Sequence, residues 1–225
     1  YTCDPRIVPN ARKLEAITYD EMLELASLGA QVLHNRSVEM AKRYNVNMEV
    51  LSSFSGKPGT KVKEVTKVEK TNIAGVAKDT SIARVALIGL QHNPGVAFQV
   101  FDLLSKHNIN VDVILQSIGR EDTKDISFTV DGKDLDDAIA TLEENKARLG
   151  YQELHSERNI AKLSIVGAGM MSNPGVAAKM FESLYNEGVN INMISTSEIR
   201  VTVLINEKDG VRAMNAVHDA FNLAD

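Results

Sequence analysis

The pentapeptide Asn-Pro-Gly-Val-Ala occupies residues 93–97 and recurs unchanged at residues 173–177. Each copy follows an apolar run, at residues 84–89 and 162–167, and opens a segment whose apolar residues have helical spacing. Further along, Ile-Asn-Val at residues 109–111 matches Val-Asn-Ile at residues 189–191. A repeat of about 80 residues is the size of a domain, so the sequence predicts two copies of one domain.

The spacing of apolar residues within the first copy changes along the chain. Val96, Val100 and Leu104 have helical spacing, whereas Ile109, Val111, Val113 and Leu115 alternate as in a strand. Residues 126–130 alternate again, residues 135–142 return to helical spacing, and a strand at residues 151–155 closes the unit. This order predicts an α+β fold of the ferredoxin-like βαββαβ type, an antiparallel sheet with both helices on one face.

The second copy has no closing strand of its own before the sequence ends at Asp225. An open edge of a sheet leaves backbone donors and acceptors unpaired, and proteins usually fill or protect it. The strand-like run at residues 72–77 precedes the first copy and is the candidate to fill this place. We therefore expect the first unit, residues 81–156, to be inserted in the second, residues 72–80 plus 157–225.

Composition excludes several classes of protein. A net charge of −5 removes the electrostatic basis for nucleic-acid binding, and no apolar run approaches the roughly 20 residues that span a membrane. Cys3 is the single cysteine, so an internal disulfide is impossible and a reducing, cytoplasmic setting fits. The five histidines lack the close spacing of metal ligands and are expected to be structural or surface residues, with no metal site.

Residues 1–60 differ in character from the repeats and suggest the tail of a larger α/β domain that continues upstream. Thr18 or Asp20 can cap a helix that ends at Gly29, and residues 36–44 and 46–51 predict a second helix and a strand. The lysine-rich stretch at residues 61–71 has interspersed glutamates and is expected to be a solvated linker.

Two glycine-rich stretches resemble nucleotide-binding loops only weakly. In residues 56–60 a proline follows Lys57 where a phosphate-binding loop needs Ser or Thr, and no helix follows. Residues 167–172 lack the third glycine of a dinucleotide fingerprint, and the unit continues as βαββ. The second copy has two more residues here than the first, so we interpret this stretch as a lengthened ligand-binding loop.

The repeated turn can also carry chemistry. Pro94 fixes φ, Gly95 permits close backbone approach, and a helix that starts there presents free N–H groups that suit a small carboxylate. The polar residues Asn110, Asp112 and Gln116 on the following strand could hold an ammonium group. An amino-acid site is therefore one interpretation. A plain helix-start turn beside a solvated polar face is the other.

The longest motifs resemble the aspartokinase family. Residues 166–170, 173–176 and 190–200 resemble its paired regulatory ACT domains, and residues 1–6 and 25–34 resemble the end of its kinase domain. The resemblance implies an enzyme that uses ATP with magnesium to phosphorylate the β-carboxylate of aspartate. It also implies feedback inhibition by lysine, threonine or both through the ACT domains of a homodimer. The catalytic residues are expected upstream, so this chain alone should be inactive.

The resemblance also assigns residues to sites. It places Tyr1, Arg6, Gln31 and Val32 at ATP, although Gln31 stands where the family usually has lysine and cannot neutralise phosphate. Two effector sites are implied between the first ACT domain of one chain and the second of its partner. The threonine-type site would use His92, Asn93, Ala97, Gln116, Asn190 and Ile191. The lysine-type site would use Asp112, Val176, Ser197 and Glu198.

Two other functions remain open. Some members of the family have a separate, non-catalytic regulatory subunit that associates with a kinase subunit and begins near the position of Lys70. The kinase-like residues 1–60 argue against that alternative. The other is an ACT-containing dehydrogenase with a nicotinamide cofactor at residues 167–170, which the missing third glycine disfavours.

Overall fold

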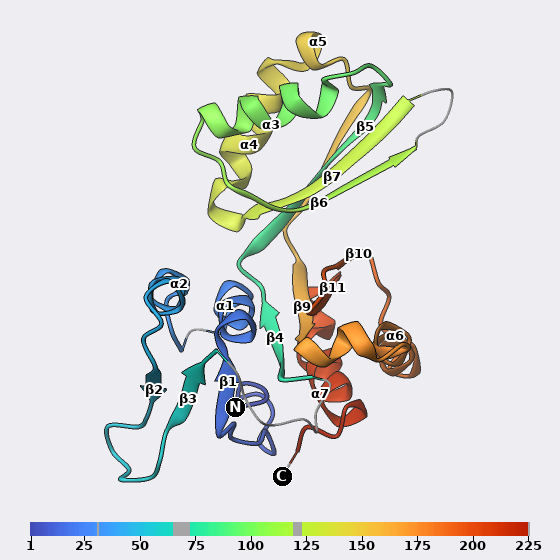
Figure 1. Cartoon of the computed structure of the whole chain (residues 1–225). Helices are drawn as coiled ribbons and strands as arrows, with labels where there is room; N and C mark the ends of the chain where they lie inside the picture. The colour runs from blue at the N-terminus through green and yellow to red at the C-terminus, as the bar shows by residue number, and fades with distance from the viewer. Residues whose placement is uncertain (31, 65–72, 119–122, 225) are drawn as a thin grey trace. The chain divides into compact units, whose positions relative to one another are not determined.

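The computed structural model describes residues 1–225 except residues 31, 65–72, 119–122 and 225. The chain forms two compact units (Figure 1). The smaller unit comprises residues 80–160 and contains the first repeat. The larger unit comprises residues 1–79 and 161–225 and contains both the N-terminal segment and the second repeat.

The smaller unit is an antiparallel sheet with its two long helices on one face (Figure 1). Its strand order is β6-β7-β5-β8. The elements are β5 (Ile82–Gln91), α3 (Val96–Lys106), β6 (Val111–Ile118), β7 (Thr123–Asp131), η1 (Gly132–Asp134), α4 (Leu135–Glu144), α5 (Lys146–Leu149) and β8 (Glu153–Glu157). The predicted α+β class and ferredoxin-like order are confirmed, with α5 as an additional turn of helix.

The core of the smaller unit lies between the sheet and the helices. Phe128 on β7 is fully buried, and its ring meets Phe101 of α3 edge to face with centroids 5.5 Å apart. Leu87, Leu104 and Leu142 complete this layer from β5, α3 and α4. Each fully buried side chain of this size stabilises the fold by about 1.5–3 kcal/mol.

A β-bulge in β6 changes which side chains face the helices. The pairing with β7 shifts register between Val111 and Ile114, so that Ile114 lies opposite Phe128 and Gln116 opposite Ile126. The expected alternation through Leu115 is therefore wrong beyond Val113, and Leu115 is exposed. An extra residue in one strand reverses the faces of all residues beyond it. Gln116 thereby comes to the same face as the start of α3.

The second repeat has the same order of elements, but one strand comes from elsewhere in the sequence. Its elements are β9 (Ile160–Val166), η2 (Ala168–Ser172), α6 (Val176–Asn186), β10 (Met193–Thr196), β11 (Arg200–Asn206), η3 (Glu207–Asp209) and α7 (Gly210–Ala220). The sheet order is β10-β11-β9-β4, in which β4 (Gly75–Asp79) pairs antiparallel with β9. The strand that precedes the first repeat thus completes the sheet of the second.

The N-terminal segment forms a small sheet with two helices and belongs to the same compact unit as the second repeat. Its elements are β1 (Ala16–Thr18), α1 (Tyr19–Ser27), α2 (Asn35–Arg43), β2 (Met48–Val50) and β3 (Thr60–Lys63), with sheet order β1-β3-β2. Ala77 and Val166 from the second repeat belong to its hydrophobic core. The segment therefore shares its core with the sheet of the second repeat.

Strand β3 corrects the expectation that a solvated linker begins at residue 61. Val62 is completely buried between the charged neighbours Lys61 and Lys63, and β3 pairs in parallel with β1. A four-residue strand whose alternate residues are lysines has too weak an apolar pattern to be recognised from the sequence. The rest of the expected linker, residues 65–72, lies outside the described residues.

The repeated glycines are required by backbone conformation. Gly95 and Gly175 have φ of 91° and 93° and each immediately precedes its helix, as predicted for the helix starts. No atom of the described residues lies within 4 Å of a Cβ built at either glycine, so packing within the chain does not require glycine here. The left-handed conformation, which other L-residues adopt at a cost, explains glycine at both positions.

Replacing Gly95 by alanine tests this explanation. We expect Gly95→Ala to lower the free energy of unfolding of the smaller unit by about 1–2 kcal/mol, because Cβ strains the left-handed backbone. Urea denaturation measures this change. Gly56→Ala is the matched control, since Gly56 lacks a left-handed φ and also has open space around its Cβ. Equal effects of the two substitutions would contradict the explanation.

A buried histidine joins the beginning of the chain to its last helix. His218 on α7 is fully buried, and its Nε2 lies 2.9 Å from Thr2 Oγ1. The Thr2 hydroxyl proton is donated to the Leu223 carbonyl, so Nε2–H is the donor to Oγ1. Nδ1 has no hydrogen-bond partner among the described residues. Burial lowers the pKa of His218 below its ordinary value of 6.5, partly opposed by Asp219.

The larger unit should therefore lose stability in mild acid. The unfolded chain binds a proton at His218 at a higher pH than the folded chain does, so the free energy of unfolding falls as pH drops through 6.5 toward the folded pKa. His218→Gln should reduce this slope between pH 7.5 and 5.5 while lowering stability at neutral pH. Urea titrations at both pH values measure it. An unchanged slope in the variant would argue that His218 has an ordinary pKa.

Candidate functional site

Each repeat has a pocket at the same structural place, where the Asn-Pro-Gly turn leads into a helix. In the smaller unit the pocket has a volume of about 410 Å³ and is formed by residues 91–97 with Gln116, Lys124 and Ile126. In the larger unit the pocket is about 480 Å³ and is formed by Met170, residues 173–177, Ser197, Glu198 and Val201. The repeat in sequence is thus also a repeat of cavities.

The helix starts give both pockets a preference for anions. Neither α3 nor α6 has a side-chain hydrogen bond at its N-cap, as far as the described residues show. The N–H groups of a first helical turn carry a partial positive charge and suit a carboxylate. Because the cap residue is glycine in both helices, a ligand can approach this end without meeting a side chain at that position.

The charged residues that line the two pockets differ. The pocket of the larger unit contains Glu198, whose carboxylate suits an ammonium group. The pocket of the smaller unit contains Lys124 and His92 instead. The larger unit's pocket therefore has both parts of a site for a zwitterionic amino acid, a helix start for the carboxylate and a carboxylate for the ammonium group.

The structure gathers the predicted effector residues into two groups. His92, Asn93, Ala97 and Gln116 share the pocket of the smaller unit, and Val176, Ser197 and Glu198 share that of the larger unit. The other three line neither pocket. Asp112 is an exposed residue of β6, Asn190 is exposed before β10, and Ile191 packs on the larger unit's core. The two combined sites across chains remain predictions.

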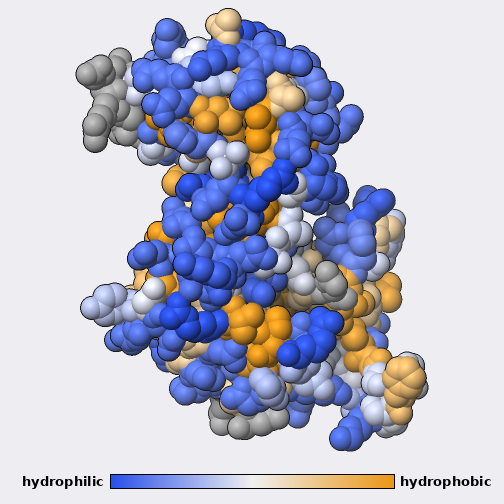
Figure 2. All heavy atoms as spheres, turned by 180° about the vertical axis from the view of Figure 1, so that it is seen from behind, coloured by the Kyte–Doolittle hydropathy of each residue, from blue (hydrophilic) through white to orange (hydrophobic). Residues whose placement is uncertain are grey.

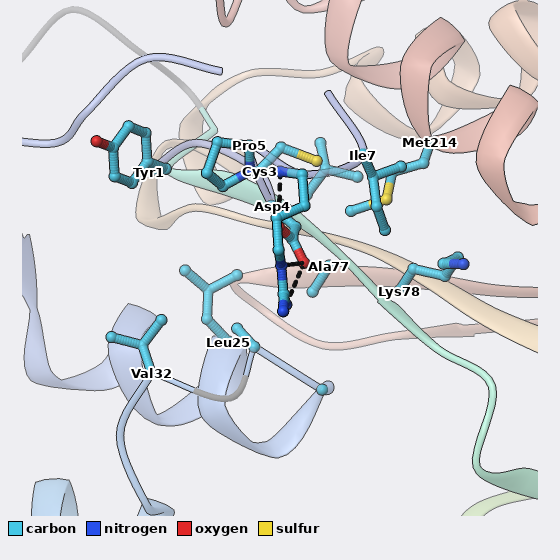
Figure 3. Close-up of a pocket in the computed structure, with 14 residues that line it drawn as sticks. Tyr1, Cys3, Asp4, Pro5, Ile7, Leu25, Val32, Ala77, Lys78 and Met214 are labelled. Carbon is cyan, nitrogen blue, oxygen red and sulfur yellow. Dashed lines mark hydrogen bonds and ion pairs between the residues drawn. The ribbon is translucent and has the colours of Figure 1, made fainter. Parts of the chain in front are cut away.

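A third cavity, of about 340 Å³, lies wholly within the larger unit and involves three of the four residues assigned to ATP (Figure 3). Tyr1, Arg6 and Val32 line it, while Gln31 lies outside the described residues. The remaining lining residues, which sequence reasoning did not assign, include Cys3, Leu25, Ala77 and Met214. Figure 3 shows side chains from the N-terminal segment, from β4 and from α7 around this cavity.

Arg6, one of the residues that the resemblance assigns to ATP, is paired within the chain. Arg6 Nη2 lies 2.7 Å from Asp4 Oδ2, and its Nε donates to Asp4 Oδ1 at 3.0 Å. The hydrogen bond from Arg6 lowers the pKa of Asp4 below its ordinary value. The guanidinium itself is exposed, with 83% of the side-chain surface accessible. Its outer edge therefore remains open to a second anion.

The sequence contained a signal for some of the residues that were missed. Ile126 and Val201 occupy the same position in the two repeats, and each lines its pocket. Met170 lies in the two-residue extension that distinguishes the second repeat, and it also lines a pocket. Extending the comparison of the repeats to the third strand would have found the first pair. Lys124 has no such signal.

None of the described helices combines the length and apolar character that crossing a bilayer requires. Among the described residues, no three or more His, Cys, Asp or Glu side chains are grouped so that they could hold a metal ion.

The chain is similar to known protein families and to individual proteins over its whole length. A family model described as "ACT domain" matches residues 85–145 and 163–221, and one described as "Amino acid kinase family" matches residues 1–52. Aspartokinase 2 of Bacillus subtilis (strain 168) is 48% identical and the aspartokinase of Bacillus sp. (strain MGA3) 47% identical over 225 residues. Both matches cover 100% of this chain and 55% of the relative, so the chain spans about half of their length.

Solved structures of aspartate kinases are also similar to this chain. The aspartate kinase of Clostridium acetobutylicum superposes with a TM-score of 0.89 at 26% identity, over 98% of this chain and 52% of that one. Aspartokinase III of E. coli in complex with lysine and aspartate gives 0.79 at 27% identity, over 100% and 49%. The regulatory subunit of aspartate kinase from Thermus thermophilus gives 0.64 at 40% identity, over 67% of this chain and 99% of that subunit.

The burial of Cys3 beside the cavity of the N-terminal segment predicts that its thiol reacts slowly. Cys3 is buried, and burial raises the pKa of its thiol to about 12. At pH 8 we expect alkylation by iodoacetamide to be about a thousandfold slower in the folded chain than in urea, because the thiolate is the reactive form. Mass spectrometry of quenched samples measures both rates. Equal rates would show that Cys3 is accessible and ionises normally.

Proposed function

The chain belongs to the aspartate kinase family, and on that premise we propose that it is the allosteric region of such a kinase together with the end of its catalytic domain. The whole enzyme would transfer the γ-phosphoryl group of ATP to the β-carboxylate of aspartate. This chain would bind end-product lysine, threonine or both and inhibit that reaction. The pocket beside Glu198 is the observation that carries the proposal, since it pairs a helix start with a carboxylate.

The larger unit's pocket is proposed as the primary amino-acid site. The ligand carboxylate would accept hydrogen bonds from the first turn of α6, and its ammonium group would bind Glu198. Lysine is the favoured ligand, in keeping with the lysine complex of the E. coli relative. The pocket of the smaller unit would take threonine, with Gln116 and Asn93 as hydrogen-bond partners. Inhibition requires that the ligand bind the inhibited state better than the active state.

Nucleotide binding is proposed for the cavity at Tyr1, Arg6 and Val32. The apolar side chains fit a base or ribose, and the exposed edge of Arg6 fits a phosphate while Asp4 holds its other edge. ATP bound with magnesium would supply the phosphoryl group, and we assign no magnesium ligand to the described residues.

A cytoplasmic setting is also proposed for the chain. Its single cysteine, Cys3, is buried and free, and proteins without disulfides suit a reducing compartment.

A homodimer through the ACT domains is the proposed assembly. Strands β6 and β10 are edge strands of their sheets and carry the exposed residues Ile114 and Ile194, which occupy equivalent positions in the repeat. Figure 2 shows hydrophobic surface interspersed among hydrophilic side chains. Exposed edge strands with apolar side chains are suited to pairing with a second copy. Such pairing would also supply the combined effector sites expected from the sequence.

A separate, non-catalytic regulatory subunit is the alternative. The Thermus thermophilus subunit supports it, since 99% of that protein matches part of this chain. The match of residues 1–52 to the amino acid kinase family favours the first proposal, because the Thermus thermophilus subunit covers only 67% of this chain.

Isothermal titration with lysine and with threonine tests the proposed site. We expect saturable binding of at least one, and Glu198→Gln should weaken lysine binding about tenfold or more, because the variant lacks the charge that pairs with the ammonium group. Glu182→Gln on the exposed face of α6 removes the same charge away from the pocket and should bind as the parent does. Equal weakening by both variants would contradict a specific role for Glu198. No heat with either amino acid would contradict the effector function.

A further inference from the structure

Helix α1 of the N-terminal segment contacts two segments next to the pocket beside Glu198. One is the start of η2 and the other is the start of β11. Glu21 Oε1 accepts a hydrogen bond from the backbone N–H of Ala168 at 3.1 Å. Glu24 Oε2 accepts one from Arg200 Nη1 at 2.9 Å. Glu21 and Glu24 are three residues apart, so they project from the same side of the helix. One helix face therefore holds the start of η2 and the start of β11.

The Glu21 carboxylate is also bound to the N-terminus of its own helix. Its second oxygen, Oε2, accepts hydrogen bonds from the Thr18 N–H at 3.1 Å and the Thr18 hydroxyl at 2.9 Å, which makes it part of the capping box of α1. A capping box fixes the first turn of a helix. Displacement of Ala168 would consequently disturb the N-terminus of α1 itself.

The Glu24 contact is an ion pair partly removed from water. The side chains of Arg200 and Glu24 are only 19% and 25% exposed. Arg200 Nε is buried and has no hydrogen-bond partner among the described residues. An arginine in such surroundings depends on its one carboxylate, because separating the pair would leave a poorly solvated charge. Arg200 and Glu24 should therefore move together.

Both contacts lead directly to pocket residues. The Arg200 carbonyl accepts a hydrogen bond from the Ser197 N–H at 2.8 Å, and the turn so closed contains Ser197 and Glu198. Ala168 begins the turn η2, which carries Met170 into the pocket lining. The Gly167 N–H donates to the Ile199 carbonyl at 2.9 Å and ties the two segments to each other.

We propose that Glu21 and Glu24 are positioning residues that couple occupancy of the pocket beside Glu198 to the position of α1 in the kinase segment. This inference rests on the proposed amino-acid site. A ligand ammonium that draws on Glu198 shifts the 197–200 turn, Arg200 transmits the shift to Glu24, and η2 transmits it to Glu21. The contacts of Glu21 and Glu24, and the two backbone hydrogen bonds that connect them to the pocket, all lie within the larger unit. The coupling therefore needs no movement of the smaller unit.

The segment that binds Glu21 is also the place where the two repeats differ in length. The segment between the first strand and the Asn-Pro-Gly turn is two residues longer here than in the first repeat, and it forms η2. The first copy's shorter segment contains no such turn in its described residues. The backbone N–H that Glu21 binds belongs to Ala168, the first residue of η2 in this longer segment.

Hydrogen exchange of the whole chain, with and without lysine or threonine, tests the coupling. In the ligand-free Glu21→Gln/Glu24→Gln variant we expect the amides of Ala168 and Ser197 to exchange about tenfold faster than in the parent, because both segments lose a charge-assisted anchor. In the parent, ligand should slow exchange in α1. In the variant, ligand should still bind, as calorimetry reports, but leave α1 unchanged. Glu39→Gln on the exposed part of α2 is the matched control.

The outcomes separate this inference from the proposed function. Unchanged exchange at Ala168 and Ser197 in the ligand-free variant would overturn the coupling whether or not a ligand is found. Slowed exchange in α1 of the ligand-bound variant would overturn it as well. If the double variant unfolds, Glu24→Gln alone is measured with the same expectation at Ser197. Failure of the parent to bind either amino acid would count against the proposed function, while the ligand-free comparison would still decide the coupling.

Discussion

The antiparallel pairing of β4 with β9 is the constraint on which the rest of the structure depends. It joins residues 75–79 to residues 162–166 and completes the second sheet with a strand from before the first repeat. The pairing ends at Asp79 and Lys162, an almost completely buried lysine whose Nζ lies 3.7 Å from the Asp79 carboxylate. Beyond this pair the chain leaves the larger unit and later returns to it. The insertion of one repeat in the other follows from this pairing.

The same pairing places the N-terminal segment against the second repeat. Ala77 of β4 and Val166 of β9 belong to the core that also contains Tyr19, Met22 and Leu25 of α1. Because a short segment with two helices and three short strands buries little by itself, a shared core stabilises both parts. The shared core also brings the carboxylates of α1 within hydrogen-bonding distance of η2 and β11. These contacts are thus a consequence of how the sheet is completed.

The two repeats contain pockets with the same backbone arrangement but different charged residues. Both begin at a glycine with a left-handed φ, and both place a helix start beside the third strand of a sheet. Glu198 lines one pocket and Lys124 lines the other, so the two pockets differ in charge. Where the two repeats differ in length, the longer segment contains η2. The two repeats therefore share a backbone frame around each pocket and differ in the charged residues that line it.

The sequence by itself determined the repeat, the order of elements, the helix starts and the need for an extra strand, because these follow from local periodicity, turn chemistry and the cost of an open edge. It did not reveal β3, whose single buried Val62 lies between lysines, or the bulge that turns Gln116 toward the pocket. Nor did it indicate that Glu21 and Glu24 meet Ala168 and Arg200. Those contacts join residues more than 140 positions apart. Only tertiary packing decides them, because local sequence carries no information about which surfaces of two distant segments will be buried together.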